Sequence, residues 1–113
     1  MQITITARHT ILPDDIKEHT RSKLENMFKD YPRVETAHVI FDTEKFMHLT
    51  EIVVQGKNKL RLEAEDQSDD IFKSSDAAIE KIERQLRRSR DKIIDHKASR
   101  NRETLKDVEP SED

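Results

Sequence analysis

Hydrophobic and polar positions alternate in four short segments of the chain. In the first segment, Ile3, Ile5 and Ala7 share one face and polar residues occupy the other. The remaining three follow one another closely, with apolar faces formed by Ala37, Val39 and Phe41, by Ile52 and Val54, and by Leu60, Leu62 and Ala64. A period of two residues is typical of strands with one buried face. Because the turns at residues 42–45 and 56–59 are short, the last three strands are expected to form an antiparallel meander.

Two further segments have the spacing of amphipathic helices. The first helix is predicted to start with Pro13 in its first turn and to be stopped by Pro32. Its expected buried stripe consists of Ile16, Thr20, Leu24, Met27, Phe28 and Tyr31. The second helix is predicted from about Asp70 to Ala98, with a stripe formed by Phe72, Ser75, Ile79, Ile82 and Leu86. At 1.5 Å per residue it is roughly 43 Å long, so its last turns should overhang strands that span only about 30 Å.

The order strand, helix, three strands, helix predicts an α+β fold. The first helix is long enough for a right-handed crossover, which makes the first two strands parallel neighbours. Both helices then cover the same face of a four-stranded mixed sheet, in a two-layer βαβββα domain. We expect this domain to span residues 1–100, and we expect residues 101–113 to form an acidic, disordered tail.

Composition limits the classes of protein to which the chain can belong. With 113 residues, of which 33% are hydrophobic and 40% charged, the chain fits one domain with a thin core. The absence of cysteine excludes disulfides and thiolate metal sites. We expect no signal peptide, and no apolar run is long enough for a membrane helix. The expectation is a soluble cytoplasmic protein that does not bind membranes and is monomeric when free.

The net charge of −3 conceals a strongly basic segment near the C-terminus. Residues 81–102 carry nine basic and three acidic side chains, a balance of +6, whereas residues 1–80 have a balance of −5 and residues 103–113 a balance of −4. Such asymmetry indicates a polyanionic partner more strongly than the overall charge does.

The basic residues of this segment fall on one side of the predicted helix. On a helical wheel the side opposite the buried stripe carries Lys81, Arg84, Arg88 and Lys92, and Arg87 flanks them. A row of cations on a rigid helix can meet a phosphate backbone. The residues alone leave two interpretations open, an ordinary solvated face and a binding surface for RNA or an anionic protein.

No pattern in the sequence indicates catalysis. The five histidines lack the spacing of metal ligands, and the single glycine, Gly56, excludes a glycine-rich phosphate loop. The acidic pairs Asp14-Asp15 and Asp69-Asp70 stand where helices begin, so capping and the helix dipole account for them. Four of the five aromatic residues fall in stripes expected to be buried, which favours recognition of RNA by backbone and shape over base stacking. We expect no enzymatic activity, cofactor, metal or small-molecule substrate.

The second helix also carries a motif. Its segment Asp70–Ile79, followed by Glu80–Arg88, resembles the C-terminal helix of the ribosome hibernation promoting factor and ribosome-associated inhibitor family. The opening Met-Gln-Ile-Thr-Ile and the pair Glu44-Lys45 with His48 are also similar to this family. The resemblance covers about residues 1–98 and has the family's order of strands and helices, so the chain is expected to be a short member.

The resemblance implies a fold related in shape to double-stranded RNA-binding domains. It also implies binding to the small ribosomal subunit and the 70S ribosome, over the messenger RNA and transfer RNA sites, with reversible arrest of translation under stress or in stationary phase. The contacts are expected on the backbone of 16S ribosomal RNA. The family's basic positions match Lys81, Arg84, Arg87, Arg88, Arg90 and Lys92, with Lys23 as a weaker match on the first helix.

Two questions remain open at the level of the sequence. The core is similar to members that promote ribosome dimers, whereas the acidic tail is similar to inhibitor-type members, so the sequence does not decide whether bound ribosomes pair. We expect the protein to lack the extra C-terminal domain of long members, and we therefore do not expect pairing by self-association. The alternative function is a general module for double-stranded RNA or for an anionic protein.

Overall fold

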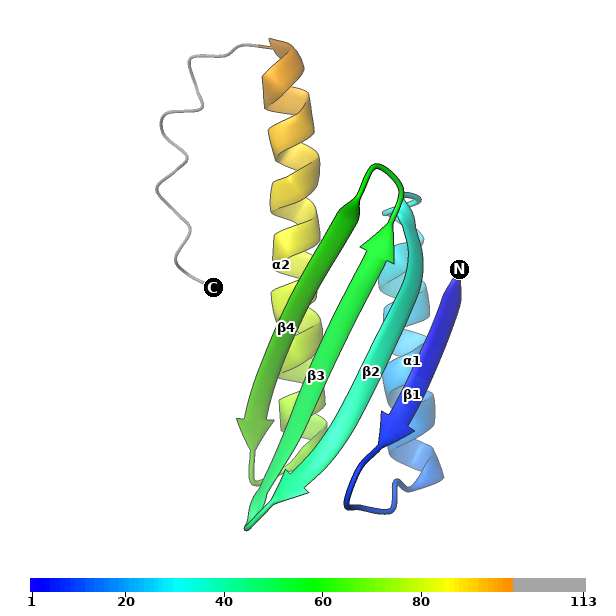
Figure 1. Cartoon of the computed structure of the whole chain (residues 1–113), viewed down its shortest axis with the longest axis vertical. Coiled ribbons are helices and arrows are strands. Elements are labelled where there is room, and N and C mark those ends of the chain that lie inside the picture. Colours follow the sequence, from blue (N-terminus) through cyan, green and yellow to red (C-terminus); the bar gives the residue numbers. More distant parts are fainter. Residues whose placement is uncertain (99–113) are drawn as a thin grey trace.

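The computed structural model confirms the predicted order of elements. It describes the backbone of residues 1–98 and the side chains of residues 1–89; the predicted acidic tail lies outside the described residues. The elements are β1 (Gln2–Ala7), α1 (Asp14–Phe28), β2 (Val34–Glu44), β3 (Met47–Gly56), β4 (Leu60–Ser68) and α2 (Ile71–Ala98). The order in the sheet is β1-β2-β3-β4, with β1 parallel to β2 and the other pairs antiparallel. Both helices lie on one face (Figure 1), so the α+β, two-layer βαβββα prediction is confirmed.

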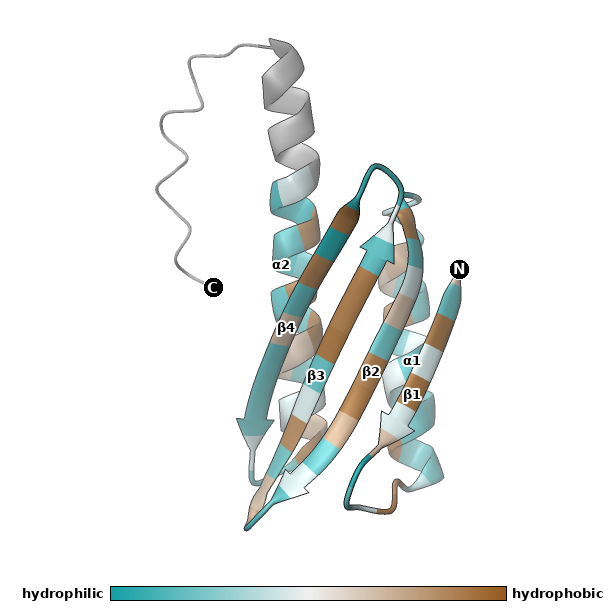
Figure 2. Cartoon of the chain, in the orientation of Figure 1, coloured by the Kyte–Doolittle hydropathy of each residue, from teal (hydrophilic) through white to brown (hydrophobic). Residues whose placement is uncertain are grey.

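The buried face of the sheet is built largely by the residues that the alternation indicated, although Ala7, at the end of β1, is exposed. Ile5, Val39, Ile52 and Ala64 lie side by side in one row of the register across all four strands. Figure 2 shows the alternation as brown and teal bands along the strands. Against these rows pack the stripes of α1 and α2, with the buried apolar side chains Ile16, Leu24 and Phe28 from α1 and Ala78, Ile79, Ile82 and Leu86 from α2.

The boundaries of α1 differ slightly from the prediction. The helix begins at Asp14, so Pro13 stands one residue before it, and no side chain caps its first turn. It ends at Phe28, and two tight turns, closed by hydrogen bonds from Asp30 N to Met27 O and from Tyr31 N to Phe28 O, follow before Pro32. A proline disfavours helical backbone in the residue before it, so Pro32 prevents Tyr31 from continuing the helix.

The prediction that Phe72 belongs to the buried stripe of α2 is wrong. This side chain is 37% exposed, and its ring meets the His19 ring edge-on with centroids 5.2 Å apart. Ser74 is buried instead. Its Oγ is 2.9 Å from Oγ1 of the buried Thr50, so each hydroxyl has a hydrogen-bond partner. The Asp70 carboxylate caps the helix by accepting a hydrogen bond from the Phe72 backbone N–H at 2.9 Å, as capping at the Asp69-Asp70 pair implied.

A buried hydroxyl pair fixes the two helices against each other. Thr20 Oγ1 on α1 and Ser75 Oγ on α2 are 3.0 Å apart, and both residues are fully buried. A buried hydroxyl without a partner is costly, so each hydroxyl holds the other in place. The orientation of α2, and therefore the direction of its outer face, depends in part on this contact.

We expect Thr20→Val to lower the free energy of unfolding by about 1–3 kcal/mol, because it leaves the Ser75 hydroxyl buried without a partner. The double variant Thr20→Val/Ser75→Ala should lose less than the sum of the two single variants, since it removes both polar groups. Urea unfolding of the four proteins measures the coupling. Additive losses would show that the hydroxyl pair does not hold the helices together.

Candidate nucleic-acid interface

The position of α2 is set by the outer edge of β4. Lys81 Nζ donates a hydrogen bond to the carbonyl of Glu65, and Gln85 Nε2 donates one to the carbonyl of Glu63, each at 3.0 Å. The two donors are four residues apart on the helix, a rise of about 6 Å, and the two acceptors are two residues apart on the strand, a rise of about 6.6 Å. Because these two distances are nearly equal, successive turns of α2 can contact successive outward carbonyl groups of β4. These contacts also cover backbone acceptors of an edge strand, which would otherwise be open to pairing with another chain.

Lys81 is turned toward this sheet edge. Besides its contact with the Glu65 carbonyl, its ammonium lies 3.4 Å from a carboxylate oxygen of Asp66, and the side chain is 36% exposed. The spacing within α2 could not indicate this pair, because Asp66 comes from β4. Among the predicted site residues whose side chains are described, Lys81 therefore makes the most contacts with the sheet.

Two other predicted site residues also have acidic partners. Lys23 Nζ is 3.2 Å from Asp76, which links α1 to α2, and an Arg87 guanidinium nitrogen is 3.5 Å from Glu83. Glu83 and Arg87 are four residues apart on one helix, a spacing by which the sequence could have shown the pair. Both pairs are largely exposed, so each holds its cation weakly.

Arg84 and Arg88 differ from these three residues. They lie one turn apart on the side of α2 that faces away from the sheet, and Arg84 is exposed while Arg88 is half-buried. Neither forms an ion pair or a hydrogen bond with any residue whose side chain is described. Arg90 and Lys92 belong to α2, but their side chains lie outside the described residues. The structure thus places two unpaired guanidinium groups on the predicted face, next to Arg87.

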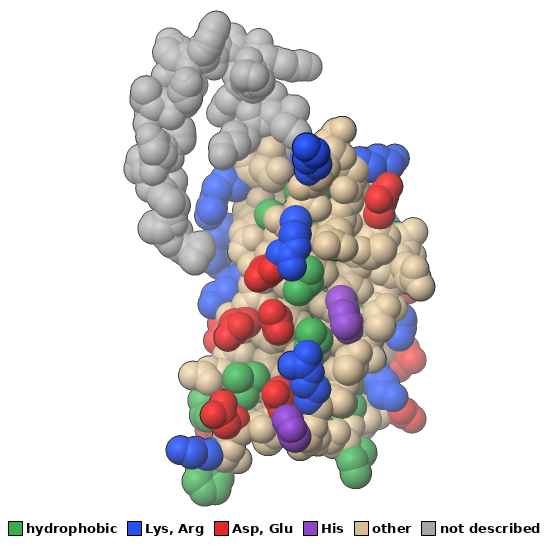
Figure 3. All heavy atoms as spheres, in the orientation of Figure 1, with side chains coloured by type: hydrophobic (Ala, Val, Ile, Leu, Met, Phe, Trp, Pro, Cys, Tyr) green, Lys and Arg blue, Asp and Glu red, His purple; other side chains and the backbone are tan. Residues whose placement is uncertain are grey.

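The open face of the sheet carries a group of acidic side chains with basic ones among them, since Arg8 lies near Glu51 and Glu65 and Arg61 pairs with Glu63. Glu51 and Glu65 are directly opposed across β3 and β4 on the open face of the sheet, with Glu63 two residues along β4. Figure 3, which looks onto this face, shows acidic side chains together with Lys or Arg and His side chains, and it shows basic side chains along the edge next to α2. The open face therefore attracts a polyanion less than the side of α2 that carries Arg84 and Arg88, and this difference favours one direction of approach.

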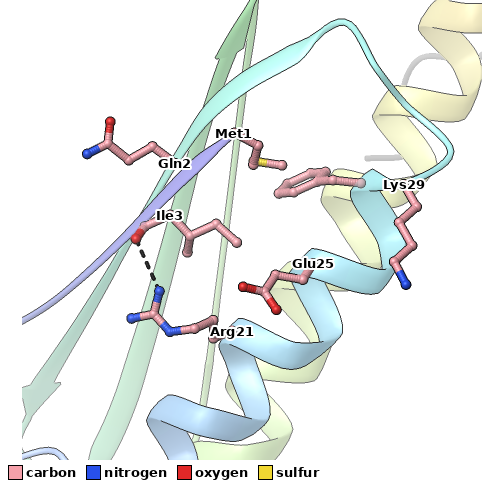
Figure 4. Close-up of a pocket in the computed structure, with 7 residues that line it drawn as sticks. Met1, Gln2, Ile3, Arg21, Glu25 and Lys29 are labelled. Carbon is pink, nitrogen blue, oxygen red and sulfur yellow. Dashed lines mark hydrogen bonds between the residues drawn. The ribbon is translucent and has the colours of Figure 1, made fainter.

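A shallow groove lies between β1 and α1 (Figure 4). It has a volume of about 500 Å³ and is lined by Met1, Gln2, Ile3, Arg21, Glu25, Phe28 and Lys29. The Arg21 guanidinium donates to the carbonyl of Ile3 at 3.3 Å and so covers the edge of β1. No histidine, serine or cysteine lines the groove, whose charged lining side chains are Arg21, Glu25 and Lys29.

The described residues give no indication of a metal site or of a membrane span. No group of three or more histidine, aspartate or glutamate side chains among them is arranged to hold a metal ion. In the same part of the chain, neither helix combines the length and the apolar character that crossing a membrane requires.

A cluster of charged side chains, His19 and Lys23 on α1 and Asp76 on α2, joins the two helices. Asp76 Oδ1 lies 2.8 Å from His19 Nε2 and 3.2 Å from Lys23 Nζ. Partial burial opposes ionisation of Asp76, but the hydrogen bonds from His19 and Lys23 outweigh it and hold its pKa below the ordinary 3.8. Near the end of β2, a hydrogen bond from His9, 2.9 Å away, and one from the Thr43 backbone lower the pKa of Asp42.

Comparison with known proteins places the chain in a family. Residues 3–94 match the family described as Sigma 54 modulation protein / S30EA ribosomal protein. The ribosome hibernation promoting factor of Salmonella typhimurium is 25% identical over 96 residues, and that of Escherichia coli K12 is 24% identical over 96 residues. Each alignment covers 85% of this chain and the full length of the relative. The resemblance carried by the α2 motif is confirmed.

Two solved structures have the same fold. A ribosomal subunit interface protein from Coxiella burnetii superposes with a TM-score of 0.74 at 24% identity, covering 80% of this chain and 98% of the other. The N-terminal domain of Thermus thermophilus Protein Y gives a TM-score of 0.69 at 23% identity, covering 78% and 98%. These likenesses confirm the arrangement of the helices on the sheet.

The Asp76 cluster makes stability depend on pH in a defined direction. Because the folded-state pKa of Asp76 is lowered, its ionised form stabilises the fold above its unfolded pKa, and this contribution is lost as the pH falls through the folded pKa, below 3.8. The difference in unfolding free energy between the parent and Asp76→Asn should therefore be constant above about pH 5 and shrink below pH 3.8. Urea unfolding between pH 2 and about 6 measures it. A difference that stays constant over this range would contradict the assignment.

Proposed function

Because the chain belongs to the Sigma 54 modulation protein / S30EA ribosomal protein family, we propose that it is a ribosome hibernation factor. It binds the small ribosomal subunit and the 70S ribosome, over the messenger RNA and transfer RNA sites, and stops translation reversibly under stress or in stationary phase. Its contacts are to the backbone of 16S ribosomal RNA, and it acts in the cytoplasm without a chemical step of its own.

One observation carries the binding site in this proposal, namely the unpaired Arg84 and Arg88 on the outer face of α2. A guanidinium that makes no internal ion pair loses no such contact when it meets a phosphate, and it can donate two parallel hydrogen bonds to it. Arg87 can exchange its exposed contact with Glu83 for a phosphate at little cost. Arg90 and Lys92, the next basic residues of the same helix, extend the proposed row.

Lys81 and Lys23 have a different place in the proposal. Both are held by contacts within the fold, and a phosphate must compete with Asp66 for Lys81 and with Asp76 for Lys23. In the proposal, these two lysines add positive charge near Arg84 and Arg88, but their ammonium groups already have acidic partners.

Electrostatics also supports one orientation on the ribosome. With α2 against the RNA, the carboxylates of Glu51, Glu63 and Glu65 face away from it, because they lie on the side of the sheet that neither helix covers. The reverse orientation would set these carboxylates against phosphates and would be repulsive. About five phosphate contacts would give a slope of the logarithm of affinity against the logarithm of salt near −4.5 on a duplex, and a shallower one on irregular RNA.

The double charge reversal Arg84→Glu/Arg88→Glu tests the site. We expect an affinity for small subunits lower by on the order of 10- to 100-fold at about 0.1 M salt, and a salt slope shallower by about two. Sucrose-gradient co-sedimentation at several salt concentrations measures both.

The matched control is Lys17→Glu/Lys73→Glu, which changes the net charge by the same amount. Both lysines are exposed and lie in first turns of helices, where a carboxylate is favourable. This control should bind almost as the parent does. Equal losses in both double variants would mean that only net charge matters. A parent that shifts naked duplex RNA in a gel but does not sediment with ribosomes would favour the general RNA-binding module instead.

A second test separates Lys81 from Arg84. Lys81→Met should lower the unfolding free energy by about 1 kcal/mol, because the contact with β4 is lost, and should weaken ribosome binding only slightly. Arg84→Met should leave stability within about 0.5 kcal/mol and make the salt slope shallower by about one. Urea unfolding and salt-dependent co-sedimentation provide the two readings. If Lys81→Met changed the slope as much as Arg84→Met, Lys81 would have to leave the sheet edge on binding.

A further inference from the structure

The turn between β3 and β4 has an unusual residue at its tip. The Leu60 N–H donates a hydrogen bond to the carbonyl of Lys57 at 3.2 Å, so residues 57–60 form the turn. Its two central residues have positive φ angles, 59° at Asn58 and 63° at Lys59, the combination typical of a type I′ turn. Asparagine adopts this backbone readily, and glycine is the residue usually found at the second position.

Lys59 therefore occupies its position against the local preference of the backbone. The Cβ of an ordinary side chain makes the left-handed region unfavourable, and glycine would avoid this penalty. Lys59 is exposed, so no packing in the core accounts for a long side chain there. Strain kept at an exposed position is a reason to look for a function of the side chain.

The fold brings this turn close to the basic helix. The Lys57 N–H donates to the carbonyl of Arg33 at 2.9 Å, and Arg33 in turn donates to Ser89 Oγ on α2 at 3.4 Å. The chain approaches so closely at Gly56 that a Cβ there would lie 2.0 Å from the Arg33 carbonyl oxygen. The turn, the segment before β2 and the middle of α2 are thus held together at one end of the sheet.

This end of the sheet is rich in unpaired positive charge. Lys57 and Lys59 are exposed, and neither they nor Arg33 forms an ion pair with a carboxylate of the described residues. Arg84 and Arg88 lie within one and a half turns of Ser89 on α2. Figure 1 shows α2 passing this turn and continuing beyond the sheet, and Figure 3 shows basic side chains at the same end of the molecule.

We propose that the β3–β4 turn is a second RNA-backbone contact, in which the Lys59 ammonium, with Lys57 beside it, binds ribosomal RNA phosphates next to those bound by Arg84 and Arg88. The inference rests on the function proposed above and extends its site from one helix to two separate elements. Cations that approach from two elements fit a folded RNA, whose phosphates are presented by more than one strand, better than a single extended acidic peptide.

The substitution Lys59→Gly separates this role from a structural one. It removes the charge and relieves the backbone at the same time, so the melting temperature should stay the same or rise by a few degrees. Ribosome affinity at moderate salt should nevertheless fall several-fold, and the salt slope should become shallower by about one. A merely structural role would not produce greater stability together with weaker binding.

Lys45 provides a matched control within the same sheet. It also has a positive φ, 57°, and lies in the turn between β2 and β3, at the opposite end of β3. Lys45→Gly therefore makes the same chemical change, with the same relief of the backbone and the same loss of charge. It should raise or preserve the melting temperature as Lys59→Gly does, and it should bind ribosomes like the parent.

The possible results separate this inference from the function on which it rests. If Lys59→Gly binds ribosomes like the parent while Arg84→Glu/Arg88→Glu does not, the turn is not a contact and the proposed function stands. Equal losses for Lys59→Gly and Lys45→Gly would overturn a contact localised at this end. If the parent itself does not sediment with ribosomes, the proposed function fails. A gel shift with naked duplex RNA then decides the inference, and equal shifts of parent and Lys59→Gly would overturn it.

Discussion

Burial of one apolar stripe on α2 is the constraint on which the rest of the structure depends. Ile79, Ile82 and Leu86 are almost completely buried against the sheet. Burying an aliphatic side chain of this size contributes about 1.5–3 kcal/mol, which is large beside the net stability of a small domain. Once this stripe faces the sheet, the α-helical period of 3.6 residues turns Arg84 and Arg88 to the solvent. The direction of the basic surface follows from hydrophobic packing, and the arginines themselves need no partner to hold them there.

Tertiary contacts then decide which charged side chains are paired. As a result, charge is unevenly distributed over the surface of the molecule. Asp66 pairs with Lys81 and Asp76 with Lys23, whereas Arg84 and Arg88 have no acidic partner among the residues whose side chains the structure describes. The glutamates of the open sheet face have no helix above them. A chain with a net charge of −3 can in this way present a cationic edge to RNA while its acidic surface lies on the other side. The same separation favours one orientation, because turning the molecule over would set the glutamates of the open face against the RNA.

The edges of the sheet show how a single side chain can have both a structural and an electrostatic role. Lys81 and Gln85 cover carbonyl groups of β4, and Arg21 covers one of β1. These contacts protect the two open edges from pairing with other chains. They also keep α2 in step with β4, which brings the turn at Lys59 and the arginines of α2 to the same end of the sheet. Stability and the shape of the proposed RNA surface are therefore coupled through the same contacts.

The sequence by itself determined the elements, the order of the strands and the faces of the helices. Alternation at Ile3 and Ile5 and the period of the α2 stripe are local properties of the chain, fixed by the geometry of strands and helices, so they can be read without coordinates. The cationic face of α2 follows from the same period. Only the tertiary structure decided which cations remain free, because Lys81–Asp66 and Lys23–Asp76 join residues far apart in the sequence. It also decided that Ser74 rather than Phe72 faces the sheet, and that Lys57, Arg33 and Ser89 meet at one end. Such contacts arise between elements, and their geometry is set by packing, for which no local pattern carries a signal.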